Sequence, residues 1–332
     1  MPSAISRVVL CPGQGAQAVG MGRAWAEASA EARAVFAEAD AHLGDRLGAP
    51  LSRLCWEGPA ERLNQTDAAQ PALFVAGVAS WRGLLATWNA GAAGTGVEAG
   101  LVAAAGLSLG EYTALHLAGA FSLRTGLELV ALRGRAMQDA AVAAPSGMVA
   151  LIGATEEQAQ VVCDAARGAG VLVCANFNAP GQVVLSGDAA ACQRAVAQAA
   201  AAGLRAAPLP VAGAFHSPLM VPAADRLASA LAQAEIRPPR VPVVSNVTAL
   251  PHAPGPGLTI EQTIRQRLVE QLTGPVRWAA SCQWLVGHAA SSGPAAPTAD
   301  FHELAPGTTL AGLMRRIDRG IKVITHDQPV PG

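Results

Sequence analysis

Residues 147–211 constrain the fold of this chain more than any other stretch of its sequence. Thr155 and the run Ser186-Gly-Asp188 supply helix-start signals, and Asn178 to Gly181 supplies a tight turn. Apolar runs between these signals predict the order β-α-β-β-α-β, with strands over 147–153, 171–177, 181–186 and 204–211 and helices over 155–168 and 188–202. This order is typical of a ferredoxin-like unit, which folds as one small antiparallel sheet covered by two helices.

On both sides of this unit, short apolar strands alternate with longer amphipathic helices. The predicted strands of this second pattern lie at 8–11, 101–105, 242–246, 301–304 and 322–325. Such alternation predicts an α/β fold with a parallel sheet. We therefore expect a large hydrolase-like α/β domain made of residues 1–143 and 212–332, with a ferredoxin-like subdomain inserted over 144–211. Ligands of such folds collect at the carboxyl ends of the strands and at domain seams.

Composition excludes several classes of protein for this 332-residue chain. With 51% hydrophobic and 14% charged residues it is neither disordered nor fibrous. A net charge of −1 and a single Tyr argue against nucleic acid as a partner. The six cysteines form no metal-ligand cluster, so we expect reduced thiols, no metal and no cofactor.

The sequence shows neither a signal peptide nor an 18-residue apolar segment, which predicts a cytoplasmic protein without membrane contact. We also expect a monomer.

The strongest chemical signal is the sequence Gly106-Leu-Ser-Leu-Gly110, which lies between a predicted strand and a predicted helix. In this context G-x-S-x-G is a nucleophile elbow, because small residues at both ends allow the sharp turn that exposes the serine. Ser108 is therefore the predicted nucleophile. The main-chain N–H of Leu109, at the start of the helix, is placed to stabilise an oxyanion. A serine that only caps a helix is the alternative.

A serine hydroxyl needs a base, and His216 is the leading candidate. It follows a predicted apolar strand over 209–215 and precedes a predicted helix, at the point where the small unit returns to the large one. The carboxylates between Ser108 and His216 all lie on predicted helices or helix starts, so none fits the acid of a triad. We expect a Ser-His dyad whose imidazole is oriented by a backbone carbonyl or an amide side chain.

Two further features concern the walls of the site. The loop Pro12 to Gln17 follows the first strand and resembles a dinucleotide fingerprint, but Pro12 is unfavourable there and the acidic residue expected downstream is missing. We expect this loop to bring Gln14 to the oxyanion site instead. Arg133 and Met137 share one helix face, whereas Arg135 points elsewhere. An inward Arg133 would bind a carboxylate through two hydrogen bonds, and a solvated arginine is the alternative.

Seven segments together resemble the malonyl-CoA:acyl-carrier-protein transacylase family. They cover nearly the whole chain in order: P-G-Q-G-A-Q (12–17), G-L-S-L-G-E-Y (106–112), R-G-R-A-M-Q (133–138), N-A-P-G-Q-V-V-L-S-G (178–187), G-A-F-H-S-P-L-M (213–220), E-Q-L-T-G-P-V-R-W (270–278) and E-L-A-P-G-T-T-L-A-G-L-M (303–314). A set of motifs in one order is far more specific than a single elbow.

The resemblance implies a role for each of these residues in a ping-pong transfer from malonyl-CoA to the phosphopantetheine thiol of acyl carrier protein. Ser108 would carry the malonyl group and His216 would act as base and then as acid. The Leu109 and Gln14 amides would hold the oxyanion, and Arg133 would bind the malonyl carboxylate. The remaining matches are Gln271, whose main-chain carbonyl would orient the histidine, and Met137 and Phe215, which would line the acyl pocket; Phe215 fits the malonyl-selective pattern.

One position departs from the family, since Leu107 stands where these proteins usually have His. We expect altered packing beside the elbow rather than lost chemistry. Two other functions share some of these features. A serine hydrolase, such as an esterase or thioesterase, would use the same elbow, and a nucleotide-binding module would use the glycine-rich loop. The sequence leaves open whether the carrier protein serves fatty-acid or polyketide synthesis, how strictly malonyl is preferred, and where the carrier docks.

Overall fold

The computed structural model describes residues 5–89, 100–290 and 299–329, and the chain divides into two compact units. The first unit comprises Met1–Ala131, Glu235–Val244 and Cys282–Gly332. The second comprises Leu132–Ala234 and Ser245–Ser281. The predicted insertion over 144–211 lies wholly within the second unit, and its boundaries as a separate subdomain stay a prediction.

The first unit contains the predicted parallel sheet, in the strand order β7-β2-β1-β8-β9. From Val8 onward its central strand is buried on both faces, as a parallel sheet between helical layers requires, and Val8 to Cys11 is accordingly an apolar run. The five strands are β1 (Arg7–Cys11), β2 (Leu101–Gly106), β7 (Val243–Val244), β8 (Asp300–Leu304) and β9 (Val323–His326). All five expected strands of the large domain are therefore present.

The helices of the first unit differ from expectation at two places. The sequence predicts a single helix over 23–43, but Ser29 is extended and divides it; the Ser29 hydroxyl accepts a hydrogen bond from the Ala32 N–H and caps the second part. The sequence predicts the next long helix from about Pro71 to Trp88, with the proline in its first turn. The helix instead begins at Thr66, so Pro71 lies inside it. The helices are α1 (Arg23–Ala28), α2 (Ala30–Leu43), α3 (Leu51–Glu57), α4 (Ala60–Leu63), α5 (Thr66–Asn89), α6 (Gly110–Leu117) and α13 (Thr309–Ile317).

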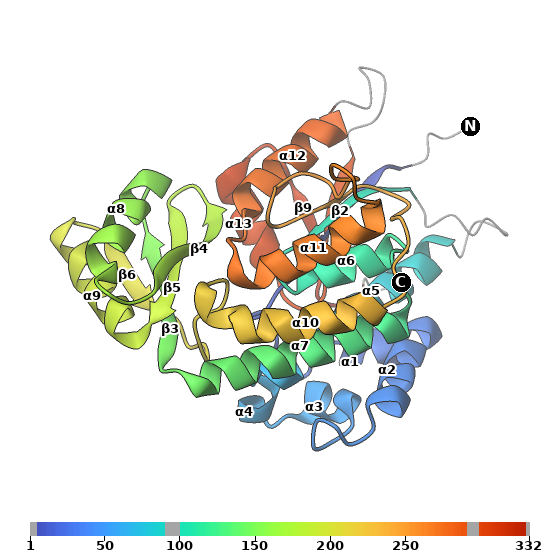
Figure 1. The fold of residues 1–332 in the computed structure, drawn as a ribbon. Helices are drawn as coiled ribbons and strands as arrows, with labels where there is room; N and C mark the ends of the chain where they lie inside the picture. Colours follow the sequence, from blue (N-terminus) through green and yellow to red (C-terminus); the bar gives the residue numbers. More distant parts are fainter. Residues whose placement is uncertain (1–4, 90–99, 291–298, 330–332) are drawn as a thin grey trace. The chain divides into compact units, whose positions relative to one another are not determined.

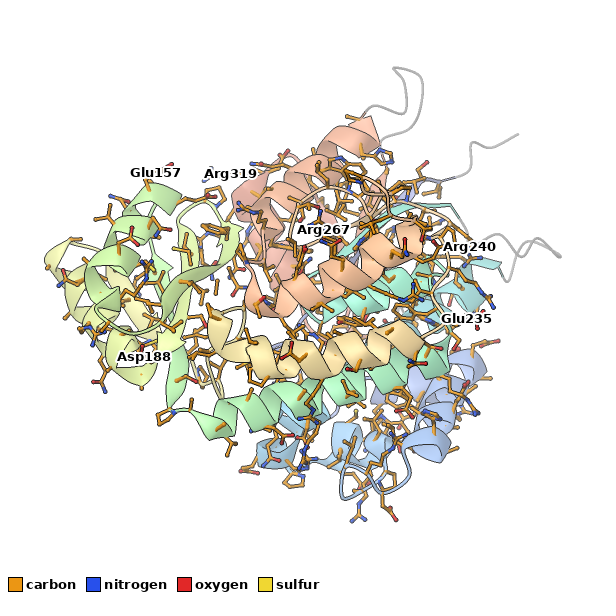
Figure 2. The ribbon with its side chains drawn as sticks, in the orientation of Figure 1. Glu157, Asp188, Glu235, Arg240, Arg267 and Arg319 are labelled. Atoms are coloured by element: carbon orange, nitrogen blue, oxygen red, sulfur yellow. The ribbon has the colours of Figure 1, made fainter. Side chains whose placement is uncertain are left out.

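The small sheet of the second unit confirms the β-α-β-β-α-β order. Its strands pair antiparallel in the order β4-β5-β3-β6, the ferredoxin-like arrangement, with α8 and α9 packed side by side on one face (Figure 1). Thr155 forms a capping box with Gln158 at the start of α8, and Asp188 is the N-cap residue of α9; Figure 2 labels Asp188 and, in the first turn of α8, Glu157. The elements are β3 (Ser146–Ile152), α8 (Glu156–Arg167), β4 (Leu172–Ala179), β5 (Gln182–Asp188), α9 (Ala189–Ala201) and β6 (Arg205–Pro208).

Outside the small sheet, the second unit contains helices and the irregular segment that carries His216. The strand expected over 209–215 is absent, because β6 ends at Pro208 and the chain continues as irregular backbone into η1 (Pro218–Met220). Pro210, which has no N–H, removes one donor from a possible ladder. Helices α10 (Val221–Gln233) and α11 (Ile260–Thr273) then pack together, and the Arg265 side chain donates to the Leu231 and Ala234 carbonyls at 2.8 Å each.

Two helices span the sequence boundaries between the units, α7 (Leu123–Ala143) and α12 (Trp278–Ala290). Within the part of the chain that the structure describes, neither these nor any other helix is both long and apolar enough to cross a bilayer.

Candidate active site

The elbow around Ser108 depends on two glycines that approach other backbone atoms too closely for any side chain. A Cβ at Gly106 would lie 1.9 Å from the Gly110 carbonyl carbon, and a Cβ at Gly110 would lie 2.1 Å from the Cys11 carbonyl oxygen. The turn is also tied to the sheet, since the Leu107 N–H donates to the Cys11 carbonyl at 3.0 Å. The spacing of G-x-S-x-G is therefore a packing requirement of this turn between β2 and α6.

Ser108 itself adopts a left-handed backbone conformation, with φ of 53°. Residues other than glycine rarely adopt this backbone conformation, and such strain persists only where the surrounding structure enforces it. Leu109 follows as the N-cap residue of α6, and the next three N–H groups, those of Gly110, Glu111 and Tyr112, donate to carbonyls of the elbow itself. The Leu109 N–H, directly after the nucleophile, is therefore the donor of this helix start to consider for an oxyanion.

The loop after β1 lies against this elbow, as expected from the sequence. A Cβ at Gly13 would lie 2.2 Å from the Leu107 carbonyl oxygen, so only glycine permits the contact. The half-buried Gln14 side chain donates to the Thr66 hydroxyl at 3.3 Å, at the start of α5. This hydrogen bond directs the Gln14 side chain to Thr66 and leaves its main-chain N–H as the group to consider for an oxyanion.

In the second unit, His216 lies on a tight turn and also has a positive φ, of 58°. Its Nδ1 lies 2.7 Å from the Gln271 main-chain carbonyl oxygen on α11. A carbonyl only accepts, so Nδ1 carries the proton and donates it, which leaves Nε2 as the acceptor in the neutral ring. The sequence predicts that a backbone carbonyl or an amide side chain orients the imidazole, and in the structure a backbone carbonyl contacts it.

The surroundings of His216 hold its imidazole neutral. Burial and, to a smaller extent, the positive charge of Arg133 together lower the pKa of His216 to about 4, against the opposing effect of the Gln271 carbonyl. The side chain is 4% exposed. At neutral pH the imidazole is therefore a neutral base, with its proton on Nδ1 and its Nε2 lone pair fixed in direction.

Gln271 also contacts Arg133, through its side chain rather than its main chain. Arg133 is 1% exposed, and its Nη2 donates to the Gln271 Oε1 at 2.9 Å. Met137, one turn further along α7, and Phe215 are buried as well. Arg135, in contrast, is exposed and forms an ion pair with Asp139 at 3.1 Å, so the prediction that it points away is confirmed.

Several residues that hold the His216 turn were not identified from the sequence. The buried Ser186 hydroxyl on β5 donates to the Phe215 carbonyl at 2.6 Å, and the Ser146 hydroxyl accepts from the Ala214 N–H at 3.1 Å. Asn246 places its Oδ1 3.5 Å from the Gln271 Nε2. The only available signal was a polar residue at the carboxyl end of a predicted strand, which Asn246 provides; isolated serines carry none.

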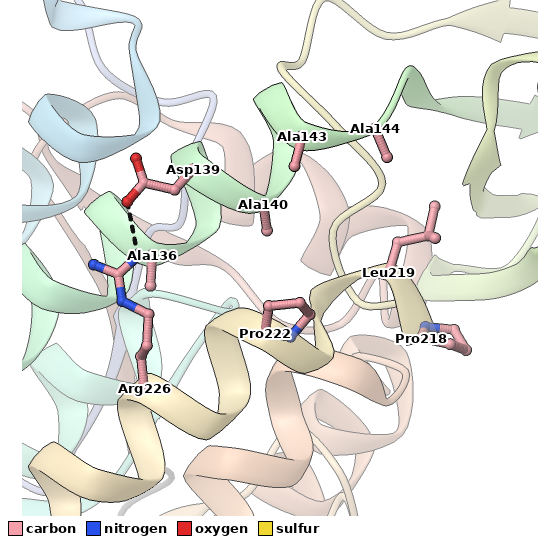
Figure 3. A pocket seen from close by; sticks show the side chains of 9 residues that line it. All are labelled: Ala136, Asp139, Ala140, Ala143, Ala144, Pro218, Leu219, Pro222 and Arg226. Carbon is pink, nitrogen blue, oxygen red and sulfur yellow. Dashed lines mark hydrogen bonds and ion pairs between the residues drawn. The ribbon is translucent and has the colours of Figure 1, made fainter.

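A pocket of about 420 Å³ lies beside this turn in the second unit. Figure 3 shows the Asp139–Arg226 ion pair, 2.7 Å between Oδ2 and Nη1, beside mostly apolar lining residues: Ala136, Ala140, Ala143, Ala144, Pro218, Leu219 and Pro222. None of the predicted site residues lines it. Among the described residues, no cluster of three or more His, Cys, Asp or Glu side chains is placed to hold a metal ion.

The predicted residues therefore fall into two groups. Gln14, Ser108 and Leu109 lie in the first unit, where the structure brings the loop after β1 to the elbow. The second unit contains the other group, in which Gln271 contacts both His216 and Arg133: Arg133, Met137, Phe215, His216 and Gln271.

Comparison with known proteins gives one consistent result. The family model described as an acyl transferase domain matches residues 8–292. A malonyl CoA-acyl carrier protein transacylase of Salmonella typhimurium is 40% identical, over 92% of this chain and 91% of that protein. Of the similar solved structures, the transacylase from Xanthomonas oryzae has a TM-score of 0.84 at 40% identity, covering 98% of this chain and 96% of that one.

A third relative was solved as a complex, namely a type II PKS acyl-carrier protein with its malonyl-transacylase. It has a TM-score of 0.84 at 35% identity and covers 98% of this chain and 96% of that one. The matched region includes the elbow, the His216 turn and the α11 segment with Gln271. The chain belongs to the acyl transferase family.

Proposed function

We propose that this enzyme transfers malonyl from malonyl-CoA to the phosphopantetheine thiol of acyl carrier protein, in fatty-acid or polyketide synthesis, through an ester on Ser108. The observation that carries the proposal is the strained serine at the β2–α6 elbow, with φ of 53°. Relatives named as malonyl CoA-acyl carrier protein transacylases, at 37–40% identity over most of the chain, support the choice of substrates.

In the first half-reaction, the His216 Nε2 takes the Ser108 proton as the serine oxygen attacks the thioester carbonyl. The main-chain N–H groups of Leu109 and Gln14 stabilise the negative charge that develops on the carbonyl oxygen. The carbon–sulfur bond then breaks, and the imidazolium returns its proton to the sulfur of CoA. The Gln271 carbonyl supports this step, because it accepts from Nδ1–H and stabilises the imidazolium.

The second half-reaction reverses these steps with a different thiol. His216 takes the proton of the phosphopantetheine thiol, the sulfur attacks the Ser108 ester, and the ester bond breaks as the proton returns to the serine oxygen. Each half-reaction forms one bond to the acyl carbon and breaks one, and His216 carries the proton between the two heteroatoms. A neutral base is needed at the start of both halves, which agrees with the lowered pKa of His216.

The remaining assignments concern specificity and context. Arg133 binds the malonyl carboxylate through charge-assisted hydrogen bonds, and Met137 and Phe215 shape the acyl pocket, where the bulk of Phe215 disfavours a branched α-carbon. We place the enzyme in the cytoplasm as a monomer that does not bind nucleic acid, in agreement with its net charge of −1. Its protein partner is acyl carrier protein.

Mass spectrometry of the intact protein tests the proposal directly. Incubation with malonyl-CoA should add one malonyl group, on Ser108, and later addition of holo acyl carrier protein should move that group to the carrier. Ser108→Ala should abolish labelling. Free malonate appearing at the same rate with and without carrier would identify a hydrolase instead, and an unlabelled Ser108 would overturn the proposal.

A double-mutant cycle tests the dyad. Residues that act as one catalytic unit give strongly non-additive losses, so Ser108→Ala, His216→Ala and the double variant should all lose about the same activity. Additive losses would show that His216 does not serve Ser108.

A further inference from the structure

Two of the cysteines in the small sheet and its helices lie on neighbouring elements, and the proposed acyl transfer uses neither of them. Cys163 lies on α8 and Cys174 on β4, and both pack into the same apolar core between the sheet and its helices. Cys163 is fully buried, whereas Cys174 is half-buried at the edge of that core. β4 is the last strand of the small sheet, and Val276 pairs with Ala175 and Phe177 along its outer edge, so the half-buried Cys174 is the member of the pair that reaches solvent.

Hydrogen bonds direct the Cys163 sulfur toward β4. The Cys163 thiol donates to the Leu172 carbonyl at 3.2 Å, and Leu172 lies two positions before Cys174 on the same strand. Side chains two positions apart on a strand point to the same face, so the Cys174 side chain faces α8, as the buried Leu172 side chain does. A β-bulge between Cys174 and Asn176 interrupts the ladder directly beside the second sulfur.

An arginine contacts the buried thiol. The Arg167 Nη2 lies 3.8 Å from the Cys163 Sγ, and the same nitrogen lies 2.7 Å from the Asp164 carboxylate. Hydrogen bonding with the Cys174 thiol and the Arg167 charge lower the pKa of Cys163, while the pKa of Cys174 is raised. The contact with the Arg167 guanidinium favours the thiolate form of Cys163, which makes this sulfur the better nucleophile of the two.

We propose that Cys163 and Cys174 are a redox-modification site that forms a reversible intramolecular disulfide when the protein meets a peroxide. The Cys163 thiolate attacks one peroxide oxygen; a sulfur–oxygen bond forms, the oxygen–oxygen bond breaks, and water leaves after proton uptake. The Cys174 thiol then attacks the sulfenic sulfur and loses its proton, the sulfur–sulfur bond forms, and a second water leaves. A dithiol reductant reverses the change by thiol–disulfide exchange.

The other cysteines make a useful contrast. Burial raises the pKa of Cys11, Cys55 and Cys282, so these thiols stay protonated. Cys192 lies in the same small sheet unit, but its thiol points to the Gly147 and Gly187 carbonyls and its pKa is also raised. Cys192→Ser is therefore the matched control.

The test uses the full chain treated with hydrogen peroxide, alkylated, digested without reduction and analysed by mass spectrometry. We expect one crosslinked peptide pair joining Cys163 to Cys174, lost on reduction, and the same pair in Cys192→Ser. Cys174→Ser should instead leave a sulfenic acid on Cys163 that dimedone traps. Arg167→Gln should slow the oxidation by about three- to tenfold, because it removes a charge that favours the thiolate.

Since Cys174 is half-buried, we expect the Cys174→Ser variant to fold, so its dimedone labelling can be read. The proposal is overturned if both thiols remain alkylatable after peroxide, if another pair of cysteines forms a disulfide, or if Cys163 gives the same oxidation product in the wild type and in Cys174→Ser. None of these readouts depends on acyl transfer, so failure here leaves the proposed function untouched.

Discussion

At the scale of single residues, Gln271 serves two site residues with two different parts of its structure. Its main-chain carbonyl fixes His216, and its side-chain oxygen accepts from Arg133. The carbonyl is available whatever the side chain is, whereas the second contact requires a side chain with an acceptor oxygen. The orientation of the base is therefore secured by the backbone of α11, and the side chain is left to position Arg133.

Arg133→Ala should separate substrate recognition from chemistry. Loss of a charge-assisted contact to the malonyl carboxylate costs about 2 kcal/mol, or roughly thirtyfold in kcat/KM. Acetyl transfer, which offers no carboxylate, should change far less. Parallel kinetics with malonyl-CoA and acetyl-CoA measure the difference.

Arg135→Ala is the control for that experiment, because Arg135 lies on the same helix but is exposed and paired with Asp139. It should leave both rates unchanged. Equal losses on the two substrates in Arg133→Ala would remove the carboxylate-binding role.

The pH dependence of Ser108 labelling should report the His216 base. A base works when deprotonated, so a pKa of about 4 keeps labelling nearly constant from neutral pH down to about 5 and makes it fall only below that. Because the Arg133 charge lowers this pKa, Arg133→Ala should move the acid limb to higher pH. Rates of reaction with a fluorophosphonate probe measure the acid limb of the wild type and of Arg133→Ala, and circular dichroism confirms that both proteins are folded at each pH. A limb near pH 6.5 in the wild type would contradict the prediction.

At the scale of elements, the chain around the site is shaped by contacts that exclude side chains. The segment 209–215 has strand-like apolar character but is irregular, and a Cβ at Gly213 would lie 2.5 Å from the Ala141 Cβ on α7. The Val211 N–H donates to the Leu209 carbonyl two residues earlier, which turns the chain back on itself. Apolar content predicts burial, and it does not distinguish a buried strand from a buried turn.

Gly110→Ala should damage the elbow severely. Its Cβ would lie 2.1 Å from the Cys11 carbonyl oxygen, so β1 or α6 must shift, and overpacking of this kind costs about 3 kcal/mol. We expect a lower denaturation midpoint and loss of Ser108 labelling.

Gly312→Ala in α13 is the matched control, since no atom from the rest of the fold lies within 4 Å of the Cβ that this substitution adds. It should be neutral or stabilise by up to about 1 kcal/mol through helix propensity. A Gly110→Ala variant as stable and as reactive as Gly312→Ala would show that the close approach at the elbow is unimportant.

At the scale of the whole molecule, buried histidines link stability to pH. Burial lowers the pKa of four of them to about 4: His116, His216, His302 and His326. Two of these, His302 and His326, are stacked with 2.8 Å between Nδ1 and Nε2, and Trp88 lies edge-on to both.

Acidification from pH 6.5 toward 4 should therefore lower the Tm. In this window the unfolded chain binds protons that the folded chain does not, so the stability present above pH 6.5 is lost as the pH falls. Glu303 has the opposite effect, because burial raises its pKa to about 7, so its contribution is lost as pH rises through 7. Four histidines outweigh one carboxyl group, and scanning calorimetry across pH 4.5–8 measures the sum. A Tm that rises on acidification would contradict this prediction.

The order of the elements, the ferredoxin-like unit and the elbow were predictable from the sequence, because apolar periodicity and turn residues act over a few positions. The partners of the key side chains were determined by the tertiary structure. Arg133 and His216 meet Gln271 from 138 and 55 positions away, and the Ser186 hydroxyl reaches the Phe215 carbonyl across 29. Such contacts depend on how α7, α11 and β5 pack, and no local pattern in the sequence encodes which atoms will then be within reach.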